Sequence, residues 1–317
     1  MPDPTPGEIA RRYTRRAFSV LRVAAGLADS ASADVRRLGR QLMGVIMAAD
    51  LADIGRRDAA ALERQIADII ATAYVAIGTA QAAAVHELLA IEAQWAAGAL
   101  GGGEPSDALL QRMVRDFLVL GAPVADQWQR QGDALTRRVT DAVREAIAVP
   151  PDPAALRSTL DDAIAAARRD AEGLADISST SAAAQGRAEV ARRAGAIGWQ
   201  WFAILDMRTT PGCALRAGLL YTLDYQPMGH SIPIERPPPR HWGCRSQLLP
   251  LMRMPKPGDI DLGTFDQWLA GLSKDEQDDV LGVGRADLYR RKVITKADLV
   301  NQRGRVLTLA ELRKRAD

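Results

Sequence analysis

The feature that most constrains the fold is a proline-rich segment that also holds most of the cysteine and histidine residues. The chain has two cysteines and three histidines, and the segment from Cys213 to Cys244 contains both cysteines together with His230 and His241. Prolines interrupt this segment at positions 227, 233, 237, 238 and 239. Because proline lacks the backbone N–H that helices and sheet ladders need, we expect an irregular loop. A long loop inside a compact domain needs a fastening, which a bound metal can supply.

Thiolate and imidazole groups are the ligands that Zn²⁺ prefers in structural sites. We therefore predict that Cys213, His230, His241 and Cys244 bind a structural zinc ion. Two alternatives stay open: a disulfide between the two cysteines, and packing of these side chains without a ligand. Two cysteines are too few for a disulfide framework, which favours assembly in a reducing cytosol. His230 could instead cap a turn, with water or a carboxylate such as Asp224 in its place.

The first two thirds of the chain carry the periodicity of long helices. Apolar residues recur at three- and four-residue steps through residues 62–77, which predicts an amphipathic stripe. Glycines at 101–103 and prolines at 150, 151 and 153 mark breaks between helices. The expected helices span 58–99, Ser106 to near Gly121, 124–148 and 153–195. The second of them is expected to direct inward Leu109, Leu110, Met113, Val114, Phe117 and Leu118.

The uncharged run at 69–85 could belong to a membrane span or to a helical bundle. It is rich in alanine and includes Thr72, Thr79 and Gln81. A spanning helix needs about 20 strongly apolar residues, and alanine adds little to insertion. We therefore predict a helix buried in a bundle. The first residues lack the apolar stretch of a signal peptide, so no membrane association is expected.

From Gly198 onward the pattern changes to short strands, expected at 199–205, 219–223 and 248–252. After Pro257 it returns to helix, acidic over 256–283 and basic over 284–317. The 34.2 kDa chain is long enough for two modest domains. We predict a mainly α protein with a small α+β module. Its expected parts are a helical bundle at 1–197, a compact proline-rich module at 198–255 clipped by zinc, and a short helical region at 256–317.

Two motifs flank the proline-rich loop. Residues 201–218 read W-x-x-x-L-D-x-R-T-x-x-x-C-x-x-x-x-G, and residues 238–246 read P-P-x-H-x-x-C-R-S. Together they resemble the phage Mu F-like minor head proteins, also called the phage head morphogenesis family. Segments at 264–269, 281–282, 288–289 and 304–309 are similar to the C-terminal region of that family. The resemblance is close over 199–250, whereas the helical half carries no specific motif.

The resemblance implies a minor capsid component inside the phage head, near the portal, that is made in the host cytoplasm. It also implies a part in head assembly and in genome packaging or delivery, with the portal protein and the major capsid or scaffold proteins as partners. The chain departs from the family at Arg216-Ala217-Gly218, where many members have R-D-G. Some relatives have C-R-C where this chain has Cys244-Arg245-Ser246, so an all-cysteine metal site is excluded here.

We predict that the protein is not an enzyme. Asp206 and Arg208 alternate at the end of a strand and could supply a general base, but no histidine or serine is spaced for a relay. We expect them to form a structural pair, with Asp206 accepting backbone amides and Arg208 bracing the loop. Arg245 is likewise expected to be structural rather than catalytic.

Two other functions remain as alternatives. A metal-dependent nuclease would use a bound cation to activate water, although zinc with four protein ligands has no open position. A non-catalytic head protein could contact the packaged DNA non-specifically through its basic runs. One run, more often a solvated face, is Arg11, Arg12, Arg15 and Arg16. The better candidate for phosphate or for an acidic portal surface is the cluster Arg290, Arg291 and Lys292.

Overall fold

The computed structural model describes residues 4–51, 53–148, 152–256, 264–302 and 305–316. The protein is mainly α with a small α+β module, as the sequence predicts. The long helices are α1 (Pro6–Met47), α2 (Arg56–Ala99), α4 (Val124–Ala148) and α5 (Pro153–Arg193), with α3 (Asp107–Arg115) between them. The strands are β1 (Gly198–Ala203), β2 (Leu220–Thr222), β3 (Pro227–Met228) and β4 (Ser246–Leu251). The short helices are α6 (Pro211–Ala214), α7 (Phe265–Ala270), α8 (Lys274–Leu281), α9 (Val283–Arg290) and α10 (Leu309–Ala316), with a 3-10 turn at Ala297–Leu299.

Side-chain caps fix where the helices begin. At α1, the Thr5 backbone N–H donates to Glu8 Oε2 at 2.8 Å and the Glu8 N–H donates back to Thr5 Oγ1 at 3.3 Å, which makes a capping box. The Leu109 N–H donates to Ser106 Oγ at 3.3 Å, so Ser106, the predicted start of this helix, caps α3. Proline opens α5, where its missing N–H costs nothing.

The prediction for α3 is wrong at its C-terminal end. The helix stops at Arg115 rather than near Gly121. Leu120 and Gly121 both have positive φ, and they form a tight turn closed by hydrogen bonds between the backbones of Val119 and Ala122. The turn buries Phe117 and Val119 but leaves Leu118 46% exposed, so Leu118 does not point inward.

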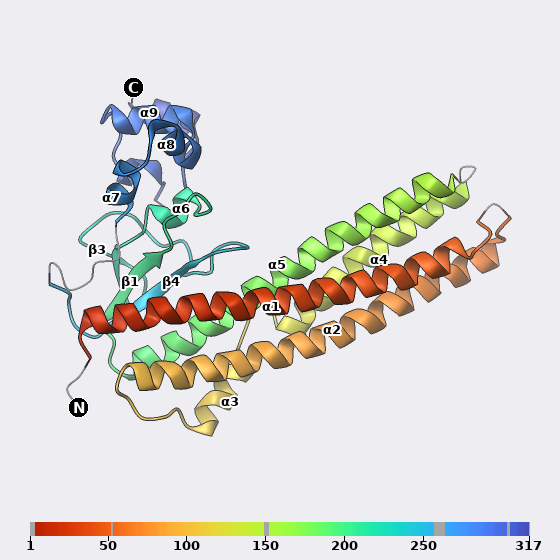
Figure 1. Ribbon diagram of the computed structural model, residues 1–317, viewed down its shortest axis with the longest axis horizontal. Coiled ribbons are helices and arrows are strands. Elements are labelled where there is room, and N and C mark those ends of the chain that lie inside the picture. Colours follow the sequence, from red (N-terminus) through yellow and green to blue (C-terminus); the bar gives the residue numbers. More distant parts are fainter. Residues whose placement is uncertain (1–3, 52, 149–151, 257–263, 303–304, 317) are drawn as a thin grey trace. The chain divides into compact units, whose positions relative to one another are not determined.

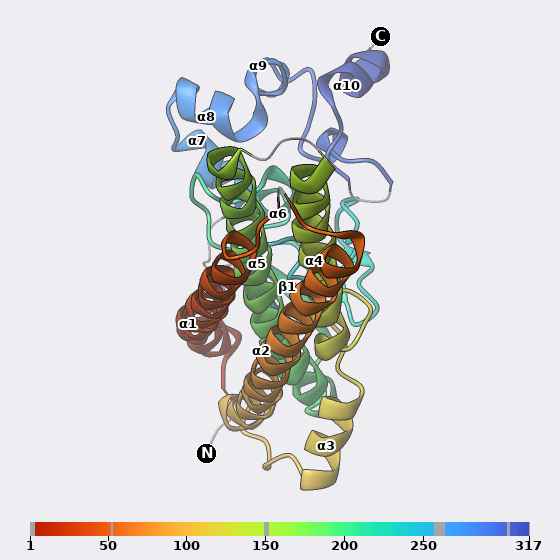
Figure 2. The same cartoon turned by 90° about the vertical axis from the view of Figure 1, so that its right-hand side faces the viewer.

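The chain forms two compact units, and three long helices contribute residues to both. One unit comprises residues 1–19, 91–110 and 184–317, and the other comprises 20–90 and 111–183. In the second unit, segments of α1, α2, α4 and α5 lie side by side (Figures 1 and 2) around one apolar core that includes Trp128 and Ile66. The predicted three-part division at residues 197 and 255 stays a prediction.

The longest apolar helix is α2, the one described helix that could cross a membrane by length and composition alone. A core helix of a bundle has the same composition, and Ile66, Ile70 and Val85 of α2 are fully buried. One face of the run at 69–85 therefore packs in the bundle, while Val75 on another face is 67% exposed. The absence of a membrane partner stays a prediction.

The first unit contains a four-stranded antiparallel sheet in the order β3-β2-β1-β4. All six residues of the central strand β1 are buried. The three predicted strands are confirmed with slightly different ends. The prolines do not exclude every strand, however, because Pro227 starts the short strand β3. It lies at the sheet edge, where a residue without an N–H is tolerated.

The short C-terminal helices pack against the same module. Capping boxes begin α7 at Thr264 and α8 at Ser273. An apolar cluster joins Phe265 and Leu312 of this region to Leu215 and Ile232 of the module. The helical C-terminal region is therefore confirmed, and its core is continuous with the segment that carries the cysteines.

Gly198 offers a test of the sheet geometry. A Cβ on Gly198 would lie 2.5 Å from the backbone carbonyl oxygen of Tyr221, which β1–β2 pairing holds in place. We expect Gly198→Ala to lower the free energy of unfolding by about 1–3 kcal/mol, the usual cost of overpacking. The control is Gly26→Ala in α1, where nothing lies within 4 Å. It should stabilise the protein by about 0.5–1 kcal/mol. Urea denaturation measures both, and equal effects would contradict the strand register.

Candidate metal centre

Cys213, His241 and Cys244 meet at one point of the proline-rich module. The two Sγ atoms are 3.8 Å apart, and Cys213 Sγ lies 3.4 Å from His241 Nε2. The three potential ligand atoms all lie within 4.8 Å of one another. Both cysteines are reduced and 2% exposed, while the imidazole is partly exposed. Three of the four predicted ligands therefore form a group that can hold a metal ion.

Local backbone structure places these three side chains. Cys213 lies in the single turn of α6, where its N–H donates to the carbonyl oxygen of Thr210 at 2.9 Å and Pro211 occupies the first position. The Cys244 N–H donates to the His241 carbonyl oxygen at 3.1 Å. Gly243 between them has φ +70°, a conformation that glycine adopts without strain. The H-x-x-C spacing is thus a tight turn that directs both side chains toward α6.

The structure does not bring His230 to this group. Its Nε2 lies 2.8 Å from the Leu220 carbonyl oxygen, and its Nδ1 accepts the Ile232 N–H at 3.1 Å. Its ring also packs edge-on against Tyr221, with the ring centroids 4.9 Å apart. Both ring nitrogens are therefore used within the protein, which is the turn-capping role left open above. Among the described residues, no fourth cysteine, histidine or carboxylate joins the three.

The electrostatics of the three side chains favour a thiolate at Cys213. A hydrogen bond from Cys244 is the main cause that lowers the pKa of Cys213, and the same bond raises the pKa of the Cys244 thiol. The hydrogen bond to Cys213 raises the pKa of His241. The metal-free centre therefore pairs one thiolate with an imidazole that gains a proton more easily. Zn²⁺ would displace these protons, because it binds thiolate and neutral imidazole.

An ion pair between Asp206 and Arg245 joins the turn that precedes α6 to the residue before β4. Arg245 Nη1 donates to Asp206 Oδ2 at 2.6 Å and Nη2 donates to Oδ1, a two-point pair. The Arg208 N–H also donates to Asp206 Oδ1 at 2.9 Å, as predicted for a carboxylate that accepts backbone amides. The side chain that pairs with Asp206 is nevertheless Arg245, not Arg208, whose own side chain is exposed. The hydrogen bond from Arg245 is the main cause that lowers the pKa of Asp206 to about 2.

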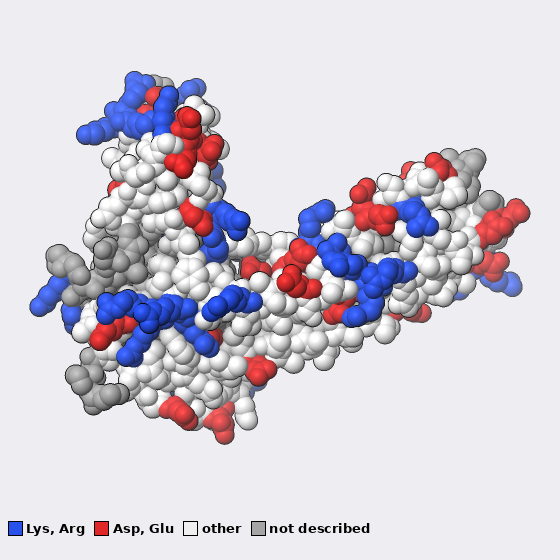
Figure 3. All heavy atoms as spheres, in the orientation of Figure 1, with Lys and Arg blue, Asp and Glu red and all other residues white. Residues whose placement is uncertain are grey.

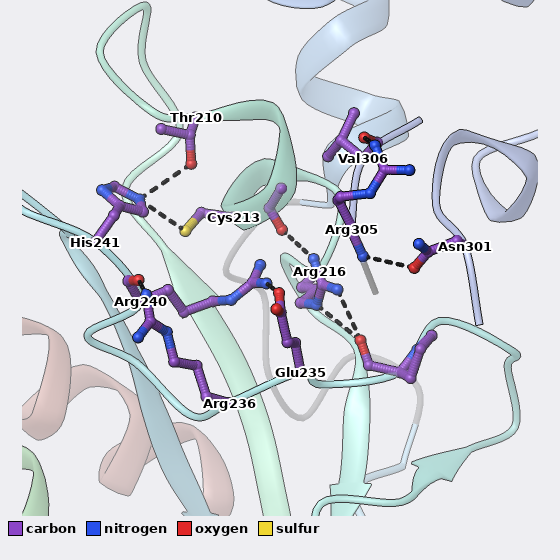
Figure 4. A network of polar contacts seen from close by, with 12 residues as sticks. Thr210, Cys213, Arg216, Glu235, Arg236, Arg240, His241, Asn301, Arg305 and Val306 are labelled. Carbon is purple, nitrogen blue, oxygen red and sulfur yellow. Dashed lines mark hydrogen bonds and ion pairs between the residues drawn. The ribbon is translucent and has the colours of Figure 1, made fainter. Parts of the chain in front are cut away.

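Arg216 is a central residue of the site that the sequence reasoning missed. Its side chain is fully buried and donates to the Pro233 carbonyl oxygen from Nε at 3.1 Å and from Nη2 at 2.7 Å. Nη1 donates to the carbonyl oxygen of Gly212 (Figure 4). Its guanidinium also lies over the Trp201 ring, 5.8 Å from the centroid. An arginine within the apolar run A-L-R-A-G was the available signal, since a buried charge needs partners.

A second buried polar cluster lies in the same unit. The carboxylate of Glu92 is fully buried between Arg187 Nε at 3.1 Å and Arg16 Nε at 2.6 Å. Arg187 also donates to Gln247 Oε1 at 2.7 Å, and Gln247 donates to the Tyr13 carbonyl oxygen at 3.3 Å. These bonds join α1, α2, α5 and β4. No sequence motif predicted these contacts.

The N-terminal basic run is only partly a solvated surface. Figure 3 shows Lys and Arg side chains gathered over the first part of α1. Arg11 and Arg15 are exposed, but Arg16 pairs with the buried Glu92, and Arg12 donates to the Ala99 carbonyl oxygen at 3.1 Å. Two of the four arginines therefore have internal structural partners.

No family model, no curated protein and no solved structure matches this chain. The resemblance to the phage head morphogenesis family consequently rests on the two motifs that flank the proline-rich loop and on the similar C-terminal segments. The function that the family implies is therefore a proposal.

Metal content tests the composition of the centre. We expect Cys213→Ser, His241→Ala and Cys244→Ser each to lower bound zinc from about one equivalent to near zero, because each removes one of three ligands. His230→Ala should keep the metal, since both of its ring nitrogens bond to the backbone. Elemental analysis of the folded proteins measures this. Loss of zinc from folded His230→Ala protein would show that the ligand set is wrong.

The Asp206–Arg245 pair should contribute a pH-dependent stability. The folded-state pKa of Asp206 is lowered to about 2, below the unfolded value of about 3.9. The stabilisation is therefore complete above pH 4 to 5 and is lost as the pH falls toward 2. The pair is partly exposed, so we expect a coupling of about 0.5–1 kcal/mol at pH 7.

A double-mutant cycle with Asp206→Asn and Arg245→Gln, measured by urea denaturation at pH 7 and at pH 3 or below, isolates this coupling from other effects of acid. A coupling that stays constant over this range would contradict the ion pair.

Proposed function

We propose that the protein is a phage minor head protein that acts in head morphogenesis near the portal, as a structural adaptor rather than an enzyme. The observation that carries this proposal is that the residues shared with the head morphogenesis family contact one another. Cys213, His241 and Cys244 converge on one centre. Asp206 and Arg245 form a two-point ion pair beside it. A motif whose members bond to one another builds a rigid module, which is what an adaptor needs.

We further propose that the metal is a structural zinc ion. Tetrahedral zinc with Zn–S bonds of about 2.3 Å and a Zn–N bond of about 2.0–2.1 Å separates two sulfurs by about 3.8 Å and a sulfur from a nitrogen by about 3.5 Å. The corresponding separations here are 3.8 Å and 3.4 Å. A disulfide requires about 2.05 Å between the sulfurs, so the geometry favours the metal over the disulfide. Zinc would tie α6 to the turn before β4.

The proposed partners are the portal protein and the major capsid or scaffold proteins, inside the phage head. The charged C-terminal region is one candidate contact, although part of its charge is used internally. Arg290 lies 2.8 Å from Asp278, and Lys296 lies 2.8 Å from Asp266. These pairs join the basic and acidic halves of the region, so their charges are already balanced within the protein.

Quantitative mass spectrometry of purified phage heads tests the adaptor function. We expect a few to tens of copies per particle, as a component near the portal requires, and a loss of infectious particles when the gene is deleted. Complementation with Cys244→Ser should fail because the centre loses a ligand, whereas Arg208→Gln, with an exposed side chain, should restore infectivity. Absence of the protein from heads at every assembly stage would refute the proposal.

A metal-dependent nuclease remains the second candidate, favoured by one observation. The group has three protein ligands rather than the four expected from sequence, and zinc with three protein ligands has a position open to water or substrate. Incubation of zinc-loaded protein with DNA and RNA tests this function. Cleavage that Cys244→Ser abolishes would favour the enzyme over the adaptor.

A further inference from the structure

A pocket of about 460 Å³ lies beside the metal centre, within the same compact unit. Three segments line it: the start of α6, the proline-rich loop, and two residues of the C-terminal region. Figure 4 shows Arg236 and Arg240 of the loop together with Thr210 at the start of α6. The lining residues are Thr210, Pro211, Gly212, Glu235, Arg236, Arg240, His241, Arg285 and Val306.

The charge of the pocket favours an anion. Three of the described lining residues are arginines and one, Glu235, is an acid. Glu235 accepts from Arg240 at 2.9 Å. Arg236 donates to the carbonyl oxygen of Arg240, and Arg285 donates to that of Leu307 at 3.1 Å. A carbonyl oxygen orients a guanidinium without neutralising it, so the lining keeps an excess of positive charge.

The side chain of Arg240 is mostly buried with one donor left unpaired among the described residues, which suits a group that binds an anion. Its side chain is only 10% exposed, yet its buried Nε has no hydrogen-bond partner among the described residues. A buried charged donor without an acceptor is costly, and an oxyanion in the pocket would remove that cost. Gly212 keeps the space beside it open, because a Cβ there would lie 3.3 Å from Arg240 Nη1.

The pocket also reaches the metal centre. Thr210 and His241 belong to its lining, and Thr210 Oγ1 lies 3.1 Å from His241 Nε2, the nitrogen that faces Cys213. Zinc in proteins usually takes four ligands, and the described residues supply three. An exogenous ligand can complete the set, and the arginine-lined pocket lies on the His241 side of the centre.

We propose that this pocket binds a phosphate group, with Arg236, Arg240 and Arg285 on its oxygens and one oxygen at the fourth position of the metal. The contact with the metal rests on the zinc centre proposed above, whereas the arginine contacts do not. A planar guanidinium fork matches phosphate geometry. Phosphate has enough oxygens to meet the metal and several guanidinium groups together, and a carboxylate has only two. The source is a small phosphate ester or a phosphate of a nucleic-acid backbone.

Titration of inorganic phosphate into the cobalt-substituted full-length protein tests the proposal. We expect one site by calorimetry and a change in the visible Co²⁺ absorption when an oxygen binds the metal. Arg285→Gln and Arg236→Gln should each weaken binding by about tenfold, as loss of a charge-assisted hydrogen bond does. Arg208→Gln, which removes the same charge from an exposed site outside the lining, should leave affinity unchanged.

The outcomes separate the pocket from the metal centre. Arginine-dependent phosphate binding by protein that takes up no cobalt would support the pocket and refute the metal centre. Cobalt binding without phosphate binding would overturn the pocket. An equal loss of phosphate affinity in Arg236→Gln, Arg285→Gln and the control Arg208→Gln would do the same. Acetate should compete weakly; acetate that binds as tightly as phosphate would also overturn it. Competition by a short single-stranded oligonucleotide, absent with glycerol phosphate, would assign the source to a nucleic-acid backbone, and the reverse to a small ester.

Discussion

The buried guanidinium of Arg216 is the constraint on which the Cys/His module depends. Apart from the short β2–β3 ladder, the proline-rich loop is irregular, so its carbonyl oxygens need other donors. Arg216 supplies them at Gly212, directly before the loop, and at Pro233 within it. Its removal would take the Arg216 donors from both carbonyl oxygens, a loss of three hydrogen bonds. The metal ligands join the same α6 to the far end of the loop, at His241 and Cys244. Arg216 therefore holds the middle of the loop, and the metal centre holds its end.

Local signals explain what the sequence predicted correctly. Helical periodicity, caps and proline breaks act within a few residues, which is why the bounds of α2, α4 and α5 were predicted closely. Contacts between distant segments leave no such pattern. Neither the pairing of Glu92 with Arg187 nor the choice of Arg245 over Arg208 as the partner of Asp206 could be inferred from spacing.

The metal ligands likewise show that sequence spacing predicts local contacts but not contacts that depend on the path of a loop. The H-x-x-C pair closes a single turn, so sequence spacing alone placed His241 beside Cys244. His230 lies in a loop whose path depends on the pairing of β2 with β3 and on its own bonds to the backbone of Leu220 and Ile232. Residue type marked it as a ligand, but the chain path gave it a different role. Because His230 is not a ligand, the described residues leave the fourth coordination position of the centre open.

A centre with two thiolates and one imidazole has a particular electrostatic character. The two thiolate charges balance Zn²⁺, so the occupied centre would be close to neutral and would attract an anion weakly. The positive charge beside it comes from Arg236, Arg240 and Arg285 instead. The arginines would therefore set most of the affinity for phosphate, while the metal fixes the position of one oxygen and the shape of the loop that carries two of the arginines. A structural role for the metal and an anion pocket beside it are compatible, because a zinc ion would organise the loop and the guanidinium groups would hold the ligand.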